Sequence, residues 1–138
     1  MNQYKLFVIV NLVFGVLLVV FAQVILPVCE SMGGVTMRCG TSVNIESVLG
    51  IALLATAVVG AAIAKKKVHL VLSAVVTVIG VFVSLVPTII VGTCPHIHMA
   101  CHAVTAPVFA LTGTVIALFS VVNIVVLKLK RRNEQDWY

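Results

Sequence analysis

The sequence predicts an all-α membrane protein with four transmembrane helices, arranged as two helix–loop–helix hairpins in a parallel pseudo-repeat. Of the 138 residues, 62% are hydrophobic and 9% are charged, which leaves too little polar surface to cover a water-soluble globule. Apolar runs lie at residues 6–28, 43–64, 69–92 and 104–127. Each is long enough to cross a hydrocarbon core about 30 Å thick, which takes roughly 20 residues. The whole chain, residues 1–138, is therefore predicted to form a single transmembrane domain with a basic tail at residues 128–138.

Helices are preferred over strands for a physical reason. Every backbone amide in lipid needs a partner within the protein, which helices supply within one segment. The alternation of polar and apolar residues that marks a membrane β-barrel strand is missing from the four runs.

The first run is predicted to be an uncleaved helix rather than a signal peptide. Lys5 followed by apolar residues is a suitable start for a signal peptide. The run is longer than an ordinary signal-peptide core, however, and Val24 to Val28 contains no small-x-small cleavage site. A lipoprotein signal would need a small residue directly before Cys29, where Val28 stands.

The other runs carry ordinary packing signals. In the second run, small residues spaced by four favour close helix approach. Pro87 predicts a kink in the third helix, and Pro107 suits the first turn of the fourth. The small residues are Ala57, Ala61, Gly60 and Ala64, with Gly50, Gly80 and Gly113 as further candidates.

The positive charges predict the orientation. With four crossings, all the basic residues except Arg38 fall on one side of the membrane, and such residues are retained in the cytoplasm. Both termini are thus predicted to be cytoplasmic and the two cysteine-bearing loops extracytoplasmic. Topology and attraction to anionic lipid account for the net charge of +5, so no nucleic-acid partner is expected. The residues on the predicted cytoplasmic side are Lys5, Lys65, Lys66, Lys67, Lys128, Lys130, Arg131 and Arg132.

The two halves of the chain resemble each other. Cys29 and Cys94 lie 65 residues apart, as do Gly15 and Gly80, and Met37-Arg-Cys39 corresponds to Met99-Ala-Cys101. Each half then reads as helix, outward loop, helix. Because both halves begin inside, a pseudo-twofold axis along the membrane normal is predicted.

Ionisable residues do not mark an ion path in the sequence. Glu46 and His69 lie near the ends of their runs and are predicted to stay out of the bundle core. Since intramembrane ionisable groups are the usual mark of ion and proton pathways, transport by this chain alone is not favoured. Other polar residues are predicted to form interhelical hydrogen bonds: Asn11, Gln23, Ser73, Thr77, Ser84, Thr112 and Asn123.

The four cysteines, Cys29, Cys39, Cys94 and Cys101, admit three interpretations. The first is a pair of structural disulfides, since the predicted compartment is one in which disulfides persist. Local bridges Cys29–Cys39 and Cys94–Cys101 are possible, as is either cross-loop pairing.

A second interpretation is thiol–disulfide exchange. His96, His98 and His102 are placed to stabilise a thiolate at Cys94 or Cys101. A four-helix bundle with outward cysteine pairs is also the plan of quinone-linked disulfide-forming enzymes, although their Cys-x-x-Cys is missing here.

A third interpretation is a metal site. Cysteine, histidine and methionine together suit Cu(I), and cysteine with histidine suits Zn(II). No cofactor is expected if the cysteines form disulfides; copper or a quinone belongs to the alternatives. The candidate metal ligands are Cys94, His96, His98, Met99, Cys101 and His102.

The two cysteine-bearing loops have a recognisable layout: Pro27-Val-Cys29…Met37-Arg-Cys39, followed by Val91-Gly-Thr-Cys94-Pro…His98-Met-Ala-Cys101. This layout resembles DUF4418, a family of small bacterial four-helix membrane proteins of unknown function. The resemblance covers nearly the whole chain. It implies an accessory role beside an ABC-transporter permease, and it supplies no catalytic residue. The predicted function is accordingly a non-enzymatic, partner-binding membrane subunit, with a membrane thiol–disulfide oxidoreductase or a copper-binding protein as alternatives.

Overall fold

The computed structural model describes residues 3–25, 38–63, 65–90 and 101–135, with the backbone alone at residues 25, 38–40, 101–102 and 134–135. No strand occurs in these segments, and the predicted all-α class is confirmed. The helices are α1 (Gln3–Val20), α2 (Arg38–Ala62), α3 (Lys66–Leu85) and α4 (Ala106–Gln135), with π-helical segments η1 (Phe21–Ile25), η3 (Val86–Ile90) and η4 (Cys101–Thr105).

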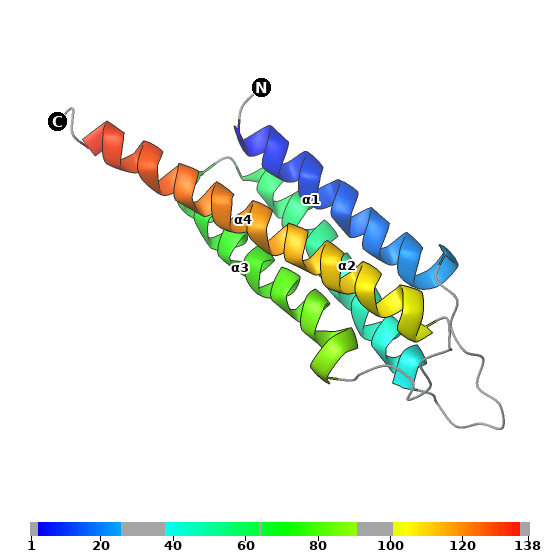
Figure 1. Ribbon diagram of the computed structural model, residues 1–138. Coiled ribbons are helices and arrows are strands. Elements are labelled where there is room, and N and C mark those ends of the chain that lie inside the picture. Colours follow the sequence, from blue (N-terminus) through cyan, green and yellow to red (C-terminus); the bar gives the residue numbers. More distant parts are fainter. Residues whose placement is uncertain (1–2, 26–37, 64, 91–100, 136–138) are drawn as a thin grey trace.

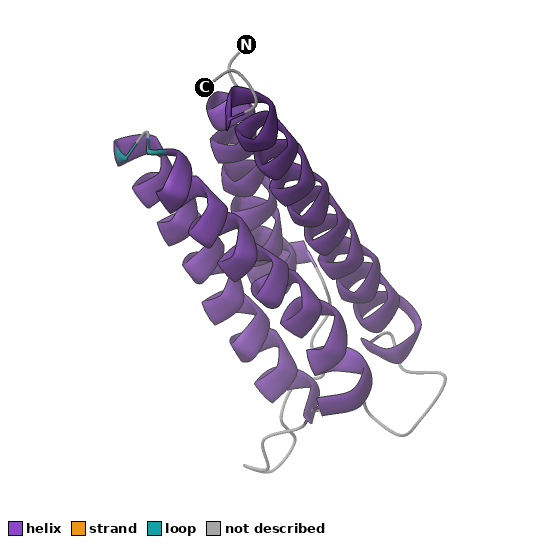
Figure 2. Cartoon of the chain, turned by 90° about the vertical axis from the view of Figure 1, so that its left-hand side faces the viewer, coloured by secondary structure: helices purple, strands orange, loops and turns teal. Residues whose placement is uncertain are grey.

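The helices lie side by side in one elongated bundle (Figures 1 and 2). α1 packs chiefly against α2, and α3 against α4. At one end α1 and α3 begin and α2 and α4 end; this end carries Lys5 and Lys65 to Lys67, and we call it the basic end. At the opposite end η1 and η3 end, and α2 and η4 begin at Arg38 and Cys101. We call this the cysteine end.

The surface of the bundle is suited to lipid. Four helical spans in the described segments are long and apolar enough to cross a membrane. Large apolar side chains lie on their outer faces, with Val24 77%, Ile89 75% and Leu111 68% exposed. A continuous apolar surface of this kind is unfavourable in water, and the four spans are consistent with a multi-pass membrane protein.

Two helix limits differ most from the prediction. α2 begins at Arg38 rather than at residue 43, and α4 continues to Gln135, so most of the predicted tail at residues 128–138 is helical. Hydropathy marks where the lipid chains begin, whereas helical hydrogen bonding continues into the polar interface. Residues 128–135 contain no glycine or proline, and basic residues near a helix C-terminus interact favourably with the helix dipole.

The core lies between the two helix pairs. Each helix contributes at least one side chain that is almost fully enclosed, so the four helices share one interior instead of forming two separate hairpins. The buried apolar residues of this core are Phe7, Leu18, Ala22, Val43, Leu53, Val76, Ile79, Val83, Phe109 and Ile116.

The closest helix approaches occur at two glycine pairs. A Cβ on Gly15 would lie 3.2 Å from the Gly50 carbonyl oxygen, and one on Gly50 would lie 3.3 Å from that of Gly15. The α3–α4 crossing is tighter, because a Cβ on Gly113 would lie 2.6 Å from the Gly80 carbonyl oxygen. The lack of a side chain at these positions therefore allows each pair of helices to touch backbone to backbone.

The irregularity predicted at Pro87 takes the form of the π-helical segment η3. Proline has no N–H to donate to the preceding turn, and its ring crowds the carbonyl four residues earlier. The Thr88 hydroxyl donates to the carbonyl oxygen of Ser84 at 2.8 Å, one turn earlier in the same span. Pro107 lies in the first turn of α4, as predicted.

Polar side chains join the helices of each pair. Gln23 of η1 donates to the Ser47 hydroxyl of α2 at 2.6 Å. Between α4 and α3, the Ser120 hydroxyl donates to the Ser73 carbonyl oxygen at 2.6 Å, and the Asn123 amide to the Ser73 hydroxyl at 2.8 Å. The prediction of interhelical hydrogen bonds is thus confirmed for Gln23, Ser73 and Asn123. It is wrong for those whose side chains donate to carbonyl oxygens of their own helix: Asn11, Thr77, Ser84 and Thr112.

The Ser120 hydrogen bond gives a testable prediction. Ser120 is fully buried, so Ser120→Ala should remove an interhelical bond and lower the free energy of unfolding by about 0.6 kcal/mol, with an upper bound near 1.7 kcal/mol. Thr114→Val is the matched control, since the exposed Thr114 hydroxyl donates only within α4, to Ala110. Unfolding by denaturing detergent measures both, and equal losses would contradict an interhelical role.

Candidate functional site

The predicted cysteine and histidine residues flank or lie within the segments at the cysteine end. Cys39 is the second residue of α2 and Cys101 the first of η4, where the structure describes the backbone alone. His102 follows in η4, likewise described by its backbone. The remaining candidates lie outside the described residues, so the disulfide, redox and copper interpretations stay predictions. These candidates are Cys29, Cys94, His96, His98 and Met99.

A polar layer lies just inside the cysteine end. The Ser47 hydroxyl accepts the hydrogen bond from Gln23 and donates its own proton to the Val43 carbonyl oxygen at 3.0 Å. Ser42, one residue before Val43, is also buried. Because Gln23 belongs to η1 and the serines belong to α2, this layer ties the end of the first helix to the beginning of the second.

Glu46 is the most unusual member of this layer. Its side chain is 0% exposed, and neither carboxyl oxygen has a hydrogen-bond partner among the described residues. The prediction that Glu46 stays out of the core because it lies near its helix end is wrong, since α2 begins two turns earlier at Arg38 and Glu46 faces inward. Burial of a charge without a partner is costly, and ionisable groups within membrane spans are candidate functional residues.

Thr105, the last residue of η4, is a second unpaired polar group at this end. It is 6% exposed, and its hydroxyl has no partner in the part of the chain that the structure describes. Threonine hydroxyls in membrane helices usually donate back to their own helix, as Thr112 does to Val108. The cysteine end thus has two buried polar groups, on different helices, that find no hydrogen-bond partner among the described residues.

No group of three His, Cys, Asp or Glu side chains that could hold a metal ion occurs among the described residues. The predicted copper ligands at residues 94–102 fall mostly outside them. The described polar groups nearby are hydroxyls, an amide and one carboxyl, which as oxygen donors suit hard cations rather than Cu(I).

At the basic end, His69 of α3 is enclosed by aromatic rings of α1. Its ring centroid lies 4.6 Å from that of Tyr4 and 6.0 Å from that of Phe7. It is 1% exposed, and neither ring nitrogen has a partner in the described segments. The prediction that His69 stays out of the core is therefore wrong as well: the imidazole fills the interface of α1 and α3, and it borders a cavity of about 370 Å³ that Lys5 also lines.

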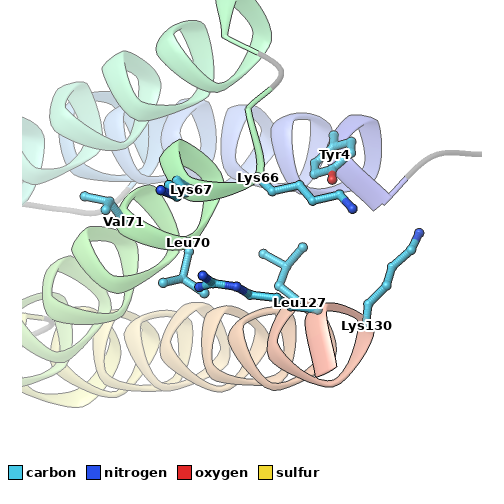
Figure 3. Close-up of a pocket in the computed structure, with 8 residues that line it drawn as sticks. Tyr4, Lys66, Lys67, Leu70, Val71, Leu127 and Lys130 are labelled. Atoms are coloured by element: carbon cyan, nitrogen blue, oxygen red, sulfur yellow. The ribbon is translucent and has the colours of Figure 1, made fainter. Parts of the chain in front are cut away.

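A second cavity, of about 380 Å³, opens at the basic end between the first turn of α1, the start of α3 and the end of α4 (Figure 3). Its floor is apolar and its rim is cationic. Lys66 extends from the start of α3 toward Tyr4, and Lys130 projects from α4 (Figure 3). The lining residues are Tyr4, Lys66, Lys67, Leu70, Val71, Leu127, Lys130 and Arg131.

Comparison with known proteins decides the family. The family model described as "Domain of unknown function (DUF4418)" matches residues 11–126 of the 138. The chain belongs to the DUF4418 family. No curated protein and no solved structure matches the chain.

Within this DUF4418 protein, the family match takes in the whole cysteine end, including Glu46, Thr105 and the four cysteines. It also includes His69. Tyr4, Leu127, Lys130 and Arg131, which line the cavity in Figure 3, lie outside the matched residues.

Sequence reasoning missed the two buried ionisable residues. A hydropathy window reports the average over all faces of a helix, so it does not tell which face Glu46 or His69 occupies. A usable signal was present for Glu46, because it shares a helical face with Gly50 and Leu53, which follow it by four and seven residues and are buried.

Proposed function

We propose that this chain is a non-enzymatic accessory subunit of a membrane complex, and that its two cysteine-bearing loops bind a second membrane protein. A permease of an ABC-transporter system is the partner suggested by the family resemblance. The observation that carries the proposal is the arrangement of helix ends. The four ends that flank residues 26–37 and 91–100 converge at the cysteine end. They lie above a polar layer in which Glu46 and Thr105 have no hydrogen-bond partner among the described residues.

Disulfides in these loops are part of the proposal. Cys39 and Cys101 lie at the beginning of α2 and of η4, at the same end of the bundle. Bridges from Cys39 to Cys29 and from Cys101 to Cys94 would each attach one loop to a rigid helix start. A cross-loop pairing would instead join the two helix pairs to each other. Either would give the docking surface a fixed shape, which lowers the entropic cost of binding.

The proposed orientation places the cysteine end outside the cytoplasm. Its support is the gathering of Lys5 and Lys65 to Lys67 at the opposite end, together with both chain termini (Figure 1). Basic residues beside membrane helices are retained in the cytoplasm.

The proposed pseudo-repeat also has structural support. The π-helical segments η1 and η3 begin at Phe21 and Val86, positions separated by 65 residues, the same separation as Cys29 and Cys94. In each half one glycine pair makes the helix contact: Gly15 with Gly50, and Gly80 with Gly113. Two similar hairpins would present two similar loops, a suitable arrangement for a partner that itself has two related halves.

A second candidate function is thiol–disulfide exchange, which Glu46 favours. A dithiol that passes two electrons and two protons to a quinone becomes a disulfide as the quinone becomes a quinol. A buried carboxyl near the reacting cysteines would be suited to receive or pass on a proton. Glu46 lies two helical turns from Cys39 in α2.

Site-specific photo-crosslinking in intact cells tests the accessory proposal. Asn44 and Val58 lie on the same outward stripe of α2, both exposed, with Asn44 near the cysteine end. A photoreactive residue at position 44 should give one protein adduct of defined mass, identifiable as a single membrane protein. At position 58 we expect lipid adducts. Replacement of the four cysteines by serine should lower the yield at position 44, because the docking loops lose their fixed shape.

Two results would contradict the accessory proposal. One is lipid adducts alone at both positions. The other is repeated turnover by the purified full chain when it is given a reduced peptide dithiol and ubiquinone, which would establish the redox candidate instead. Orientation is read in the same cells, in the cysteine-free variant, with a membrane-impermeant thiol reagent. A cysteine at position 41 should be labelled, whereas a cysteine at position 66 should be protected.

A further inference from the structure

We propose that the cavity at the basic end is a binding site for one anionic phospholipid, with the phosphate at the cationic rim and an acyl chain on the apolar floor. This inference goes beyond the accessory role, because it concerns the opposite end of the bundle. The cavity volume of about 380 Å³ lies within the usual range of small-ligand sites, roughly 300–1,000 Å³.

The charge of the rim is the first argument. Lys67 is contributed by α3, and Lys130 and Arg131 by α4, so cations from two helices far apart in sequence surround one opening. None of the described residues that line the cavity is acidic. Tyr4 of α1 adds a hydroxyl, and tyrosine is typical of the interfacial zone where headgroups lie. Basic pockets between membrane helices are known to bind the headgroups of anionic lipids.

The start of α3 is the second, independent argument. The three lysines Lys65 to Lys67 occupy a helix N-terminus, where the helix dipole disfavours positive charge. The N-cap residue is Lys65, whose side chain makes no capping hydrogen bond, since a lysine has donors and no acceptor. An anion at this rim would neutralise the lysine charges and accept hydrogen bonds from the uncapped backbone N–H groups, because helix N-termini are natural anion sites.

The apolar floor of the cavity favours a lipid over a free anion as the ligand. Leu70 and Val71 of α3 and Leu127 of α4 line it, and Val71 is 61% exposed. From Val71 toward the middle of α3, the same outward face of the helix continues with the exposed residues Val75 and Val78. Inorganic phosphate would make no contact with these apolar residues, whereas the acyl chain of a phospholipid would cover them.

Native mass spectrometry of the delipidated full chain tests the proposal with phosphatidylglycerol and phosphatidylcholine of identical acyl chains. We expect one phosphatidylglycerol to bind in preference to phosphatidylcholine. The double variant Lys130→Gln/Arg131→Gln should weaken phosphatidylglycerol binding at least about tenfold. Lys128→Gln/Arg132→Gln removes the same charge from exposed positions of α4 that do not line the cavity, and should change binding less than about twofold.

Equal loss in the two double variants would overturn the proposal, since binding would then follow net charge alone. Full competition by inorganic phosphate would overturn the lipid assignment in favour of a free-anion site. Val71→Trp supplies a variant of unchanged charge at an exposed, fold-tolerant position. It should fill the cavity and reduce bound phosphatidylglycerol, and undiminished binding would show that the lipid lies elsewhere.

Discussion

Replacing Gly113 with alanine is expected to disrupt the contact between α3 and α4. The new methyl group would lie 2.6 Å from the Gly80 carbonyl oxygen and 2.6 Å from the Ser84 backbone nitrogen. Both neighbours are backbone atoms, so no side chain can rotate away and the helices must separate. Overpacking of a close contact costs about 1–3 kcal/mol, and we expect the upper end of this range because the backbone has to move.

Gly60→Ala is the matched control for this prediction. Its added methyl group would meet Val8, Leu72 and His69 side chains at 3.4 to 3.6 Å, which is ordinary van der Waals contact. Alanine also favours a helix interior over glycine by about 1 kcal/mol, so this variant should be neutral or more stable. Unfolding of the purified protein in mixed detergent micelles measures both changes. Equal stability of the two variants would contradict the close crossing at Gly80 and Gly113.

Glu46→Met is expected to stabilise the protein. The carboxyl group of Glu46 is fully buried without a hydrogen-bond partner among the described residues. Its removal from the interior therefore relieves a desolvation cost without breaking a bond in that part of the chain. Protein data place such costs at about 1–3 kcal/mol, and methionine fills a similar volume without a polar group that needs a partner. The free energy of unfolding should rise by a similar amount.

Glu46→Gln is the control, because glutamine keeps the shape and two polar atoms of the original side chain. It should shift the unfolding free energy far less than methionine does. A loss of stability in Glu46→Met would show that the carboxyl binds a group in residues 26–37 or 91–100. A methionine variant that is more stable yet gives no protein adduct at position 44 would identify Glu46 as a functional residue, since functional sites commonly sacrifice stability.

Two ends of one bundle thus carry different chemistry. The cysteine end has buried polar groups on α2 and η4 that lack hydrogen-bond partners in the described segments, whereas the basic end has cations around an apolar floor. If the basic end holds an anionic lipid, the bundle is anchored on that side of the membrane, and the cysteine end remains available to a protein partner. The crosslinking and lipid-binding experiments examine the two ends separately.

Several features followed from the sequence alone, for a common reason. Four apolar runs must be helical because lipid offers no partner to backbone amides, so the class of the protein and the approximate spans were predictable. The even number of crossings then placed Lys5, Lys65 and Arg131 at one end and the cysteine-bearing segments at the other. Proline positions were also readable, because a missing N–H acts locally at Pro87 whatever the packing.

Only the tertiary structure decided which residues face the interior. In a membrane bundle the lipid-facing and core-facing sides are both apolar, so hydropathy does not distinguish them; this is why Glu46 and His69 were misplaced. The same ambiguity hid the fact that Gly113, and not Gly60, makes the tightest crossing. The cation-rimmed cavity was equally unreadable, because Tyr4, Lys67 and Arg131 lie on three helices that are distant in sequence and meet only through packing.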